Sequence, residues 1–171
     1  MATVLMIIAP EQFSEKELFT IKNDLEEAGH RTIIASIAAG LCSGSRQSTI
    51  TATHSLSDVH TEDYDAVVFV GGRGSEIYFA SEVALRIAAE MAAAGKITAA
   101  ICLAPAILAY AGVLENRRAT VAKIQVRTLE SKKVKYTGPG VTVDGHIITG
   151  SSPEYSRRFV QEIIKRLGEY N

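Results

Sequence analysis

The sequence predicts an α/β fold with a mostly parallel sheet and helices on both faces. Three short apolar runs, in Thr3–Ala9, Tyr64–Val70 and Ile97–Cys102, are typical of strands that are buried on both sides. Other segments carry apolar residues every three or four positions, as amphipathic helices do. Strands that alternate with such helices favour a parallel sheet covered on both faces.

The length and charge of the chain narrow the classes of function. A chain of 171 residues can bury a proper core, and no linker, repeat or low-complexity tract divides it, so we expect a single domain over residues 1–171. The net charge of −1 gives no electrostatic reason to expect binding to nucleic acid or to an anionic membrane. No apolar run approaches the length that crosses a bilayer.

The start of the chain and the number of its cysteines indicate in which cellular compartment we expect the protein. The run Val4–Ala9 is strand-like and no basic segment precedes it, so the start does not have the pattern of a signal peptide. The two cysteines, Cys42 and Cys102, are too few for a disulfide framework. We therefore expect a cytoplasmic protein in a reducing environment.

Helix signals are clearest in the first half of the chain. The apolar spacing predicts a helix over Glu15–Ala28 that ends at Gly29. Ser81 as N-cap and Gly95 as stop predict a second helix over Ser81–Ala94. The other predictions here are a loop at Pro10–Ser14, a strand at Thr32–Ile37, a Gly/Ser loop containing Cys42 at Ala38–Gln47, and a short exposed strand at Ser48–Ala52.

The second half predicts short strands and one long helix. We expect a short strand near Ala119, either a short helix or a loop at Ile124–Lys133, and strands at Lys133–Thr137 and Val141–Thr149, with a turn at Asp144-Gly145 in the last. The final helix starts at Pro153. Its apolar stripe consists of Phe159, Val160, Ile163, Ile164 and Leu167.

Cys102 lies where a buried strand ends and a helix begins, because Pro105 suits the first helical turn. A thiol in such a turn lies near free backbone N–H groups and the positive end of the helix dipole, both of which favour the thiolate. The alternative is a small buried apolar residue, which is the common fate of a free cysteine. Ligands and catalytic groups gather at the carboxyl ends of strands in such sheets, which favours a functional role.

Three further positions near strand ends each allow two interpretations. Glu17 completes a capping box with Ser14, or its carboxyl hydrogen-bonds the thiol of Cys102. Gly71-Gly72 forms a simple turn, or its N–H groups form an oxyanion hole; the spacing of a dinucleotide fingerprint is absent. Glu76, just past that turn, is by default a solvated carboxylate.

The remaining polar candidates carry weaker signals. No histidine is adjacent to Cys102 in sequence; the four are His30, His54, His60 and His146. A patch of His54, Asp58, His60, Glu62 and Asp63 could hold a metal, but its spacing matches no compact metal motif and a solvated loop is favoured. We expect neither a metal nor a cofactor. Cys42 is either an exposed thiol that could resolve an oxidised Cys102 or an uninvolved loop residue.

Five motifs follow one another along the chain: Phe13-Ser14-Glu15-Lys16-Glu17-Leu18, Asp65-Ala66-Val67-Val68-Phe69-Val70-Gly71-Gly72, Ala100-Ile101-Cys102-Leu103-Ala104-Pro105, Ala111-Gly112-Val113-Leu114 and Val143-Asp144-Gly145-His146-Ile147-Ile148-Thr149. In this order they resemble the ThiJ/PfpI superfamily, whose members include an intracellular protease and the parkinsonism-associated deglycase. They extend over nearly the whole chain. No single motif is specific, but their combination is.

The resemblance implies a flavodoxin-like α/β/α sandwich, a homodimer and a set of site residues. It implies that Cys102 is the nucleophile at the elbow and that Glu17 hydrogen-bonds its thiolate. It also implies that the backbone N–H groups of Gly72 and Leu103 form the oxyanion hole. Glu76 matches the carboxylate that completes a Cys-His-Glu triad across a subunit interface in the protease branch.

The chain departs from the family pattern at the histidines. Protease-like members carry histidine at the position of Leu103, and leucine cannot accept a proton. The deglycase branch has a histidine after the strand near Ala119, where this chain reads Ala119-Thr120-Val121-Ala122-Lys123. The family segment Ser-Arg-Gly-Pro is altered here to Gly150-Ser151-Ser152-Pro153. Peptidase activity is therefore not expected.

Three functions remain open. The first is a glyoxalase-like or deglycase-like enzyme in which Cys102 adds to a small 2-oxoaldehyde or its adduct and Glu17 carries the proton. The second is a sensor of oxidative stress, or a chaperone-like protein, that acts through oxidation of Cys102. The third is a family member that binds a metabolite without chemistry. In each case we expect a small-molecule ligand, neither nucleic acid nor a membrane as partner, and a homodimer.

Overall fold

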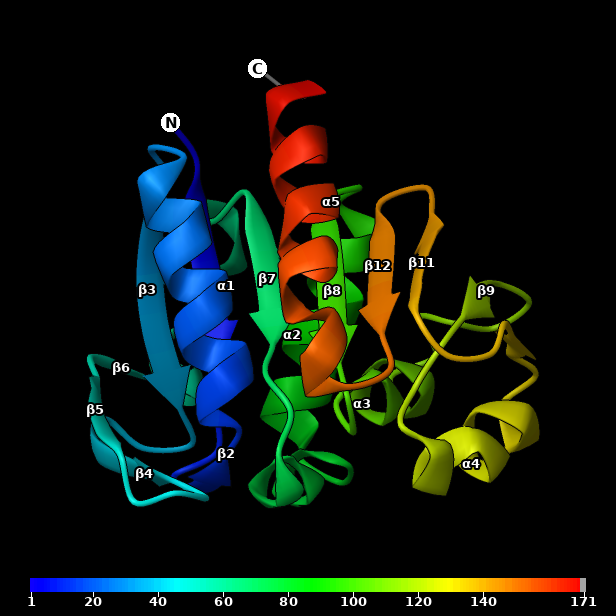
Figure 1. Cartoon of the computed structure of the whole chain (residues 1–171), viewed down its shortest axis with the longest axis horizontal. Coiled ribbons are helices and arrows are strands. Elements are labelled where there is room, and N and C mark those ends of the chain that lie inside the picture. Colours follow the sequence, from blue (N-terminus) through cyan, green and yellow to red (C-terminus); the bar gives the residue numbers. More distant parts are fainter. Residues whose placement is uncertain (170–171) are drawn as a thin grey trace.

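The computed structural model describes residues 1–169 and has a seven-stranded sheet at its centre (Figure 1). The strand order is β11-β12-β8-β7-β1-β3-β6, and every neighbouring pair is parallel except β11 and β12. The strands are β1 (Thr3–Ile7), β3 (Arg31–Ser36), β6 (His54–Ser55), β7 (Ala66–Phe69), β8 (Ile97–Ile101), β11 (Val141–Asp144) and β12 (Ile147–Gly150). The predicted α/β fold with a mostly parallel sheet is confirmed.

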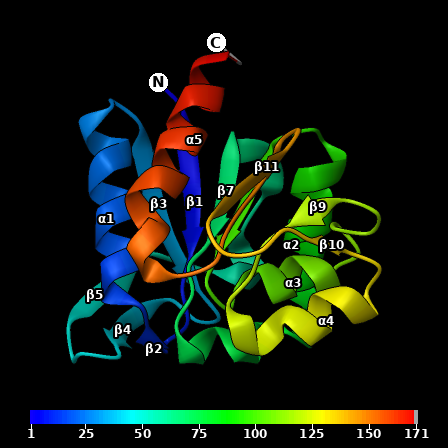
Figure 2. The same cartoon turned by 45° about the vertical axis from the view of Figure 1, so that its right-hand side comes forward.

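Helices cover both faces of this sheet. They are α1 (Glu15–Glu27), α2 (Glu82–Ala93), α3 (Pro105–Tyr110), α4 (Val126–Ser131) and α5 (Ser156–Glu169). Figure 2 shows α1 and α5 on one side of the sheet and α2, α3 and α4 on the other. This is the flavodoxin-like α/β/α sandwich that was predicted.

The continuous apolar runs are explained by burial of both faces of the sheet. In β1, Val4 and Met6 pack with the side chains of α1 and α5, whereas Leu5 and Ile7 pack with those of α2 and α3. Side chains of a strand alternate between faces, so a strand that is covered on both sides needs an apolar residue at every position. The stripe of α5 has the period of a helix that buries one face, and Phe159, Val160, Ile163 and Leu167 are all buried.

Two smaller sheets lie beside the main one. One contains β2 (Glu11–Phe13), β4 (Gly40–Gly44) and β5 (Thr49–Ala52); the other contains β9 (Arg118–Ala119) and β10 (Lys135–Tyr136). The predicted loop at Ala38–Gln47 is therefore wrong, because β4 occupies its centre and pairs with both β2 and β5. The loop at Pro10–Ser14 likewise contains a strand.

Short 3₁₀ helices connect several elements: η1 (Leu56–Asp58), η2 (Thr61–Asp63), η3 (Arg73–Tyr78), η4 (Lys123–Gln125) and η5 (Pro153–Tyr155). The ambiguous segment Ile124–Lys133 is helical, as η4 and α4. The final helix begins as η5 at Pro153 and continues as α5 from Ser156. None of the helices in residues 1–169 is long and apolar enough to cross a membrane.

The carboxyl ends of β1, β7, β8 and β12 meet at one edge of the sheet, at the bottom of Figure 1. The segments that leave this edge include β2, η3 and the turn before α3. Tyr78 anchors η3 there, because its buried hydroxyl donates to the carbonyl oxygen of Ile8 at 2.6 Å and accepts from the amide of Ile37 at 3.1 Å. The loops at this edge are thus tied to the ends of β1 and β3.

Candidate active site

Cys102 occupies the turn between β8 and α3 in a strained backbone conformation. Its φ of 64° lies in the left-handed region, which L-residues other than glycine rarely adopt. Backbone hydrogen bonds hold the residue on both sides: its amide donates to the carbonyl of Gly150 at 2.9 Å, and its carbonyl accepts from the amide of Ala122 at 2.8 Å. Strain that the surrounding structure maintains in this way is typical of functional positions. The thiol is half-buried, not sealed in the core.

Glu17 lies in the first turn of α1 and is fully buried. Its Oε1 accepts from the amide of Gly71 at 2.7 Å. Its Oε2 is also buried and has no hydrogen-bond partner among residues 1–169. Buried carboxyl oxygens without a partner are costly, which makes Glu17 a candidate functional group.

The two interpretations of Glu17 can now be separated. Ser14 does cap α1, since its Oγ accepts from the amide of Glu17 at 3.4 Å. The reciprocal arm of a capping box would take the Glu17 carboxyl to the amide of Ser14, but that amide donates to the carbonyl of Gly71 at 3.0 Å. The Glu17 carboxyl instead binds Gly71 and interacts with the thiol of Cys102.

The carboxyl and the thiol shift each other's proton equilibria. Burial raises the pKa of Glu17 to about 7, although the Gly71 amide, Ser14 and Cys102 oppose the rise. Burial, with a contribution from ionised Glu17, raises the pKa of Cys102 to about 12, against the lowering effect of the Leu103 and Gly72 amides. The amides at this turn favour the thiolate, as expected, but burial outweighs them, so that the pKa of the thiol is raised on balance.

Two glycines are required where the site is packed most tightly. A β-carbon on Gly71 would lie 2.6 Å from Glu17 Oε1 and 2.7 Å from the β-carbon of Cys102. Gly72 has a φ of 105°, and a β-carbon there would lie 2.5 Å from the carbonyl oxygen of Gln12. The absence of side chains lets the Gly72 amide join that of Leu103 at the sulfur, where both lower the pKa of the thiol. These are the two amides that the resemblance places in the oxyanion hole.

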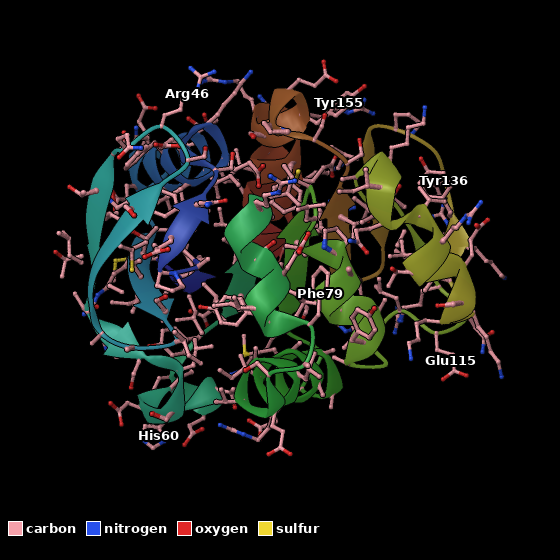
Figure 3. The ribbon with its side chains drawn as sticks, turned by 90° about the horizontal axis from the view of Figure 1, so that it is seen from below. Arg46, His60, Phe79, Glu115, Tyr136 and Tyr155 are labelled. Carbon is pink, nitrogen blue, oxygen red and sulfur yellow. The ribbon has the colours of Figure 1, made fainter. Side chains whose placement is uncertain are left out.

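The structure does not bring a histidine to the thiol. Among residues 1–169, the groups that act on Cys102 are Glu17 and the amides of Gly72 and Leu103. His30 accepts from the amide of Ala2, and His146 Nε2 lies 3.1 Å from the carbonyl oxygen of Ala92. His60 lies far from Tyr136 and Tyr155 in the view onto the carboxyl edge (Figure 3). Residues 1–169 of a single chain therefore offer no Cys-His pair at the elbow.

The other candidates lie away from the sulfur. Glu76 is exposed on η3 and does not act on the thiol. In the polar patch, His54 Nδ1 is 2.7 Å from the hydroxyl of Thr53, and Asp58 accepts from Ser55. Cys42 is 1% exposed in β4, where its thiol points to the carbonyl of Gly40 at 3.7 Å. The suggestion that Cys42 is an exposed thiol in a loop is therefore wrong.

Sequence reasoning missed the support that β2 gives to the site. Gln12 has a φ of 59°, which makes it a second strained residue beside the elbow. A β-carbon on Gly74 would lie 1.8 Å from the carbonyl oxygen of Glu11, so β2 packs directly on the turn that carries Gly72. The only signal for this strand was Phe13, a single buried apolar residue.

Sequence reasoning also missed two clefts near Pro153. One, of about 670 Å³, lies along α1 and is lined by Ser14, Glu15, Lys16, Phe19, Thr20, Ser45, Arg46 and Pro153. The other, of about 700 Å³, lies along α4; its lining is Val121, Lys123, Val126, Arg127, Glu130, Tyr136, Pro139, Ser151, Ser152, Glu154 and Tyr155. We call the second one the α4 cleft. Its size is in the range of small-molecule sites.

Comparisons with known proteins show which family the chain is similar to. The model of the DJ-1/PfpI family matches residues 2–166. An uncharacterised protein of Methanocaldococcus jannaschii is 38% identical over 99% of this chain and 84% of its own length. A deglycase of Pyrococcus abyssi is 31% identical over 95% of this chain and 98% of its own length.

Solved structures show the same similarity. A ThiJ/PfpI domain protein from Brachyspira murdochii superposes with a TM-score of 0.95 at 26% identity, covering 98% of this chain and 96% of that one. DJ-1beta of Drosophila melanogaster superposes with a TM-score of 0.86 at 28% identity, covering 97% and 90%. The family model, the relatives and the fold agree, and the chain belongs to the DJ-1/PfpI family.

Proposed function

We propose that this protein is a cysteine-dependent enzyme of the glyoxalase or deglycase type that acts on small 2-oxoaldehydes or their amine adducts. The observation that carries the proposal is the buried Glu17 carboxyl, with a free oxygen and a pKa of about 7, beside the half-buried thiol of Cys102. A relative named as a deglycase supports the same class of substrate.

In this proposal Glu17 is the general base. The thiol keeps its proton at neutral pH because its pKa is raised to about 12. As the sulfur attacks the aldehyde carbon, the proton passes to the Glu17 carboxylate and a C–S bond forms. The electron pair of the C=O π bond moves to oxygen, where the amides of Gly72 and Leu103 stabilise the negative charge. A base with a pKa near the operating pH is suited to this transfer.

The remaining steps use the same proton carrier. Glu17 returns its proton to the oxyanion, which gives a hemithioacetal. The carboxylate then removes the proton from the carbon that bears sulfur and delivers it to the neighbouring carbonyl carbon. The hydroxyl proton of the hemithioacetal moves to the oxygen of that carbonyl, so that a thioester forms without an external oxidant. Water cleaves the C–S bond and restores the thiol. For methylglyoxal the sum is addition of one water to give lactate.

An amine adduct of the aldehyde can reach the same hemithioacetal by a different first step. The sulfur displaces the amine at the hemiaminal carbon: the C–S bond forms, the C–N bond breaks, and the leaving nitrogen takes a proton from Glu17. The free amine departs and the same hemithioacetal remains. Peptidase activity is not proposed, because Leu103 stands where protease-like members carry histidine and no other histidine reaches the thiol within residues 1–169.

Turnover of methylglyoxal by the wild type and by Cys102→Ser tests this proposal. We expect lactate from the wild type and only the background rate from the variant. Cys42→Ser is the matched control, because it removes a thiol of this chain that lies away from the site. Equal background rates in all three proteins would end the proposal and favour a metabolite-binding role without chemistry.

A second candidate function rests on the partial exposure of Cys102 beside an acid. We propose oxidation to the sulfenate and sulfinate as this alternative, in which the protein reports oxidative stress or acts as a chaperone-like protein. Mass spectrometry after peroxide would place the added oxygen on Cys102. Oxygen on Cys42 alone would contradict it.

The expected assembly and compartment belong to the same proposal. We propose a homodimer, as the family resemblance implies. We propose a cytoplasmic location because the two cysteines are too few for a disulfide framework. Light scattering coupled to size exclusion measures the mass directly, and a monomer at micromolar concentration would contradict this part. Fractionation of cells that express the tagged chain tests the compartment.

A further inference from the structure

Two separate segments hold the backbone of Cys102 in its left-handed conformation. On one side, its amide donates to the carbonyl of Gly150, the last residue of β12, at 2.9 Å. On the other side, its carbonyl accepts from the amide of Ala122, between β9 and η4, at 2.8 Å. A φ of 64° is unfavourable for a residue with a β-carbon, so the turn keeps this shape only while both segments stay in place.

The segment that carries Ala122 is not part of the main sheet. The strand before it, β9, pairs with β10 in a sheet of its own, and no strand pairing within residues 1–169 joins β9 to β12. Figure 1 shows β9 beyond β11, at the side of the molecule. Arg118 makes hydrogen bonds with Val143 and Asp144 of β11, but these are exposed. They constrain the segment only at the end that is far from Ala122.

The hydroxyl of Thr149 joins the two segments in the interior. Its Oγ1 accepts from the amide of Thr120 at 3.0 Å, and both residues are buried. Thr149 directly precedes Gly150, and Thr120 lies just before the segment of Ala122. These contacts close a ring of hydrogen bonds and short backbone stretches through Cys102, Gly150, Thr149, Thr120 and Ala122.

We propose that Thr149 is a positioning residue for Cys102: its hydroxyl holds the segment of Ala122 in place and thereby keeps the strained turn closed. Thr149 is not among the groups that act on the thiol, so its effect passes through the backbone. The effect on the position of the sulfur is independent of the reaction, whereas any effect on turnover rests on the proposed function.

The alternative is that the Thr149 hydroxyl only satisfies a buried amide. A buried amide without an acceptor costs stability, so loss of this hydroxyl destabilises the fold in either case. Stability therefore does not separate a positioning role from a structural one. The reactivity of the Cys102 thiol does separate them, because it depends on where the turn holds the sulfur.

The surroundings of the sulfur set the direction of the expected change. Within residues 1–169, Glu17 is the charged group that acts on the thiol, and the amides of Gly72 and Leu103 are its other partners. Burial and Glu17 both raise the pKa of the thiol. When the turn is released, Cys102 relaxes toward a common φ and its sulfur leaves these surroundings. The thiol then becomes a stronger acid, although it is no longer beside its base.

Alkylation of Cys102 by iodoacetamide at pH 8 tests the proposal, with mass spectrometry to identify the labelled residue. Thr149→Val keeps the shape of the side chain and removes the hydroxyl. We expect Cys102 in this variant to react about tenfold faster or more, because a lower pKa increases the thiolate fraction by more than it weakens the nucleophile. Thr149→Ser restores a hydroxyl and should return the wild-type rate. Cys42 should stay unlabelled, which excludes global unfolding as the cause.

Thr98→Val is the matched control. Thr98 is also buried and lies on β8, but its hydroxyl donates to the carbonyl of Lys96, at the end of the strand away from the elbow. This variant should lose stability and keep the wild-type rate at Cys102. An unchanged or slower rate in Thr149→Val would overturn the proposal, and so would an equal acceleration in Thr98→Val or a lack of rescue in Thr149→Ser.

Amide hydrogen exchange in the wild type gives the answer if Thr149→Val does not fold. If the Thr149 hydroxyl holds the segment, the amides of Thr120 and Ala122 open together, and we expect their protection factors to agree within about tenfold. A larger difference in either direction would show that one bond opens without the other and would overturn the proposal. Neither assay needs turnover, so the results are independent of whether methylglyoxal is converted.

Discussion

The carboxyl of Glu17 accepts a hydrogen bond from the amide of Gly71 through Oε1 and interacts with the thiol of Cys102. The first contact fixes the position of the acid, because the hydrogen bond is 2.7 Å long and buried. The second places a proton acceptor beside a nucleophile. The two groups come from α1 and from the turn after β8, so only the folded chain unites them.

Turnover should depend on the ionisation of Glu17. If the carboxylate is the base, kcat/KM of the wild type rises with pH through a midpoint near 7, the pKa of Glu17 in the folded protein. Glu17→Gln has the same shape but cannot accept a proton, so we expect a loss of roughly 10²- to 10⁴-fold and no inflection near neutrality. A pH profile of methylglyoxal turnover checks this, and an inflection that survives in Glu17→Gln would assign the base to another group.

The free energy of unfolding should fall as the pH rises through the titration of Glu17. The unfolded glutamate titrates near 4.5 and the folded one near 7, so between these values the folded state holds a proton that the unfolded state has released. The stability that Glu17 contributes is full below pH 4.5 and is lost as the pH rises through 7. A shift of this size corresponds to a few kcal/mol, on the order of 3.

Urea unfolding at several pH values measures this effect as a difference between two proteins. The free energy of unfolding of wild type minus that of Glu17→Gln should decrease from pH 5 to pH 8. Other titrating groups cancel in the difference. A difference that does not change with pH would show that Glu17 keeps its ordinary pKa in the folded protein.

A methyl group on Gly72 should damage the site and the fold together. The position has a φ of 105° and leaves no room next to the carbonyl of Gln12 and the amide of Ser14. We expect Gly72→Ala to lower the free energy of unfolding by about 1–3 kcal/mol and to slow turnover, because the amide that faces the sulfur is displaced. Gly168→Ala in α5 is the control; nothing lies within 4 Å of its added carbon, and alanine favours helix.

The two cysteines should differ sharply in reactivity. In the native protein, iodoacetamide should label Cys102 and spare Cys42, since the first is half-buried and the second is 1% exposed. The rate at Cys102 should stay low at neutral pH and rise well above it, because burial and Glu17 raise the pKa of the thiol. In urea both should react alike. Fast labelling of Cys102 at pH 7 would contradict the raised pKa, and labelling of Cys42 in the native state would contradict its burial.

Prediction from the sequence succeeded where the residues of one segment alone determine its secondary structure. The apolar runs of β1, β7 and β8 and the serine cap of α2 were found at nearly the observed positions. Prediction failed at β2 and β4, because short strands at the side of a fold owe their shape to pairing partners distant in the chain. It failed for Cys42 for the same reason: Gly and Ser around it suggested a loop, whereas pairing with β5 turns the residue into the core.

The sequence by itself determined the fold class, the turn that presents Cys102 and the absence of histidine at position 103, since these follow from local patterns of side chains and backbone. Only the tertiary structure decided that the Glu17 carboxyl binds the Gly71 amide and not that of Ser14, and that burial outweighs the Leu103 and Gly72 amides in setting the pKa of Cys102. The physical reason is that desolvation and proton sharing depend on which distant segments pack together, and no local pattern records that packing.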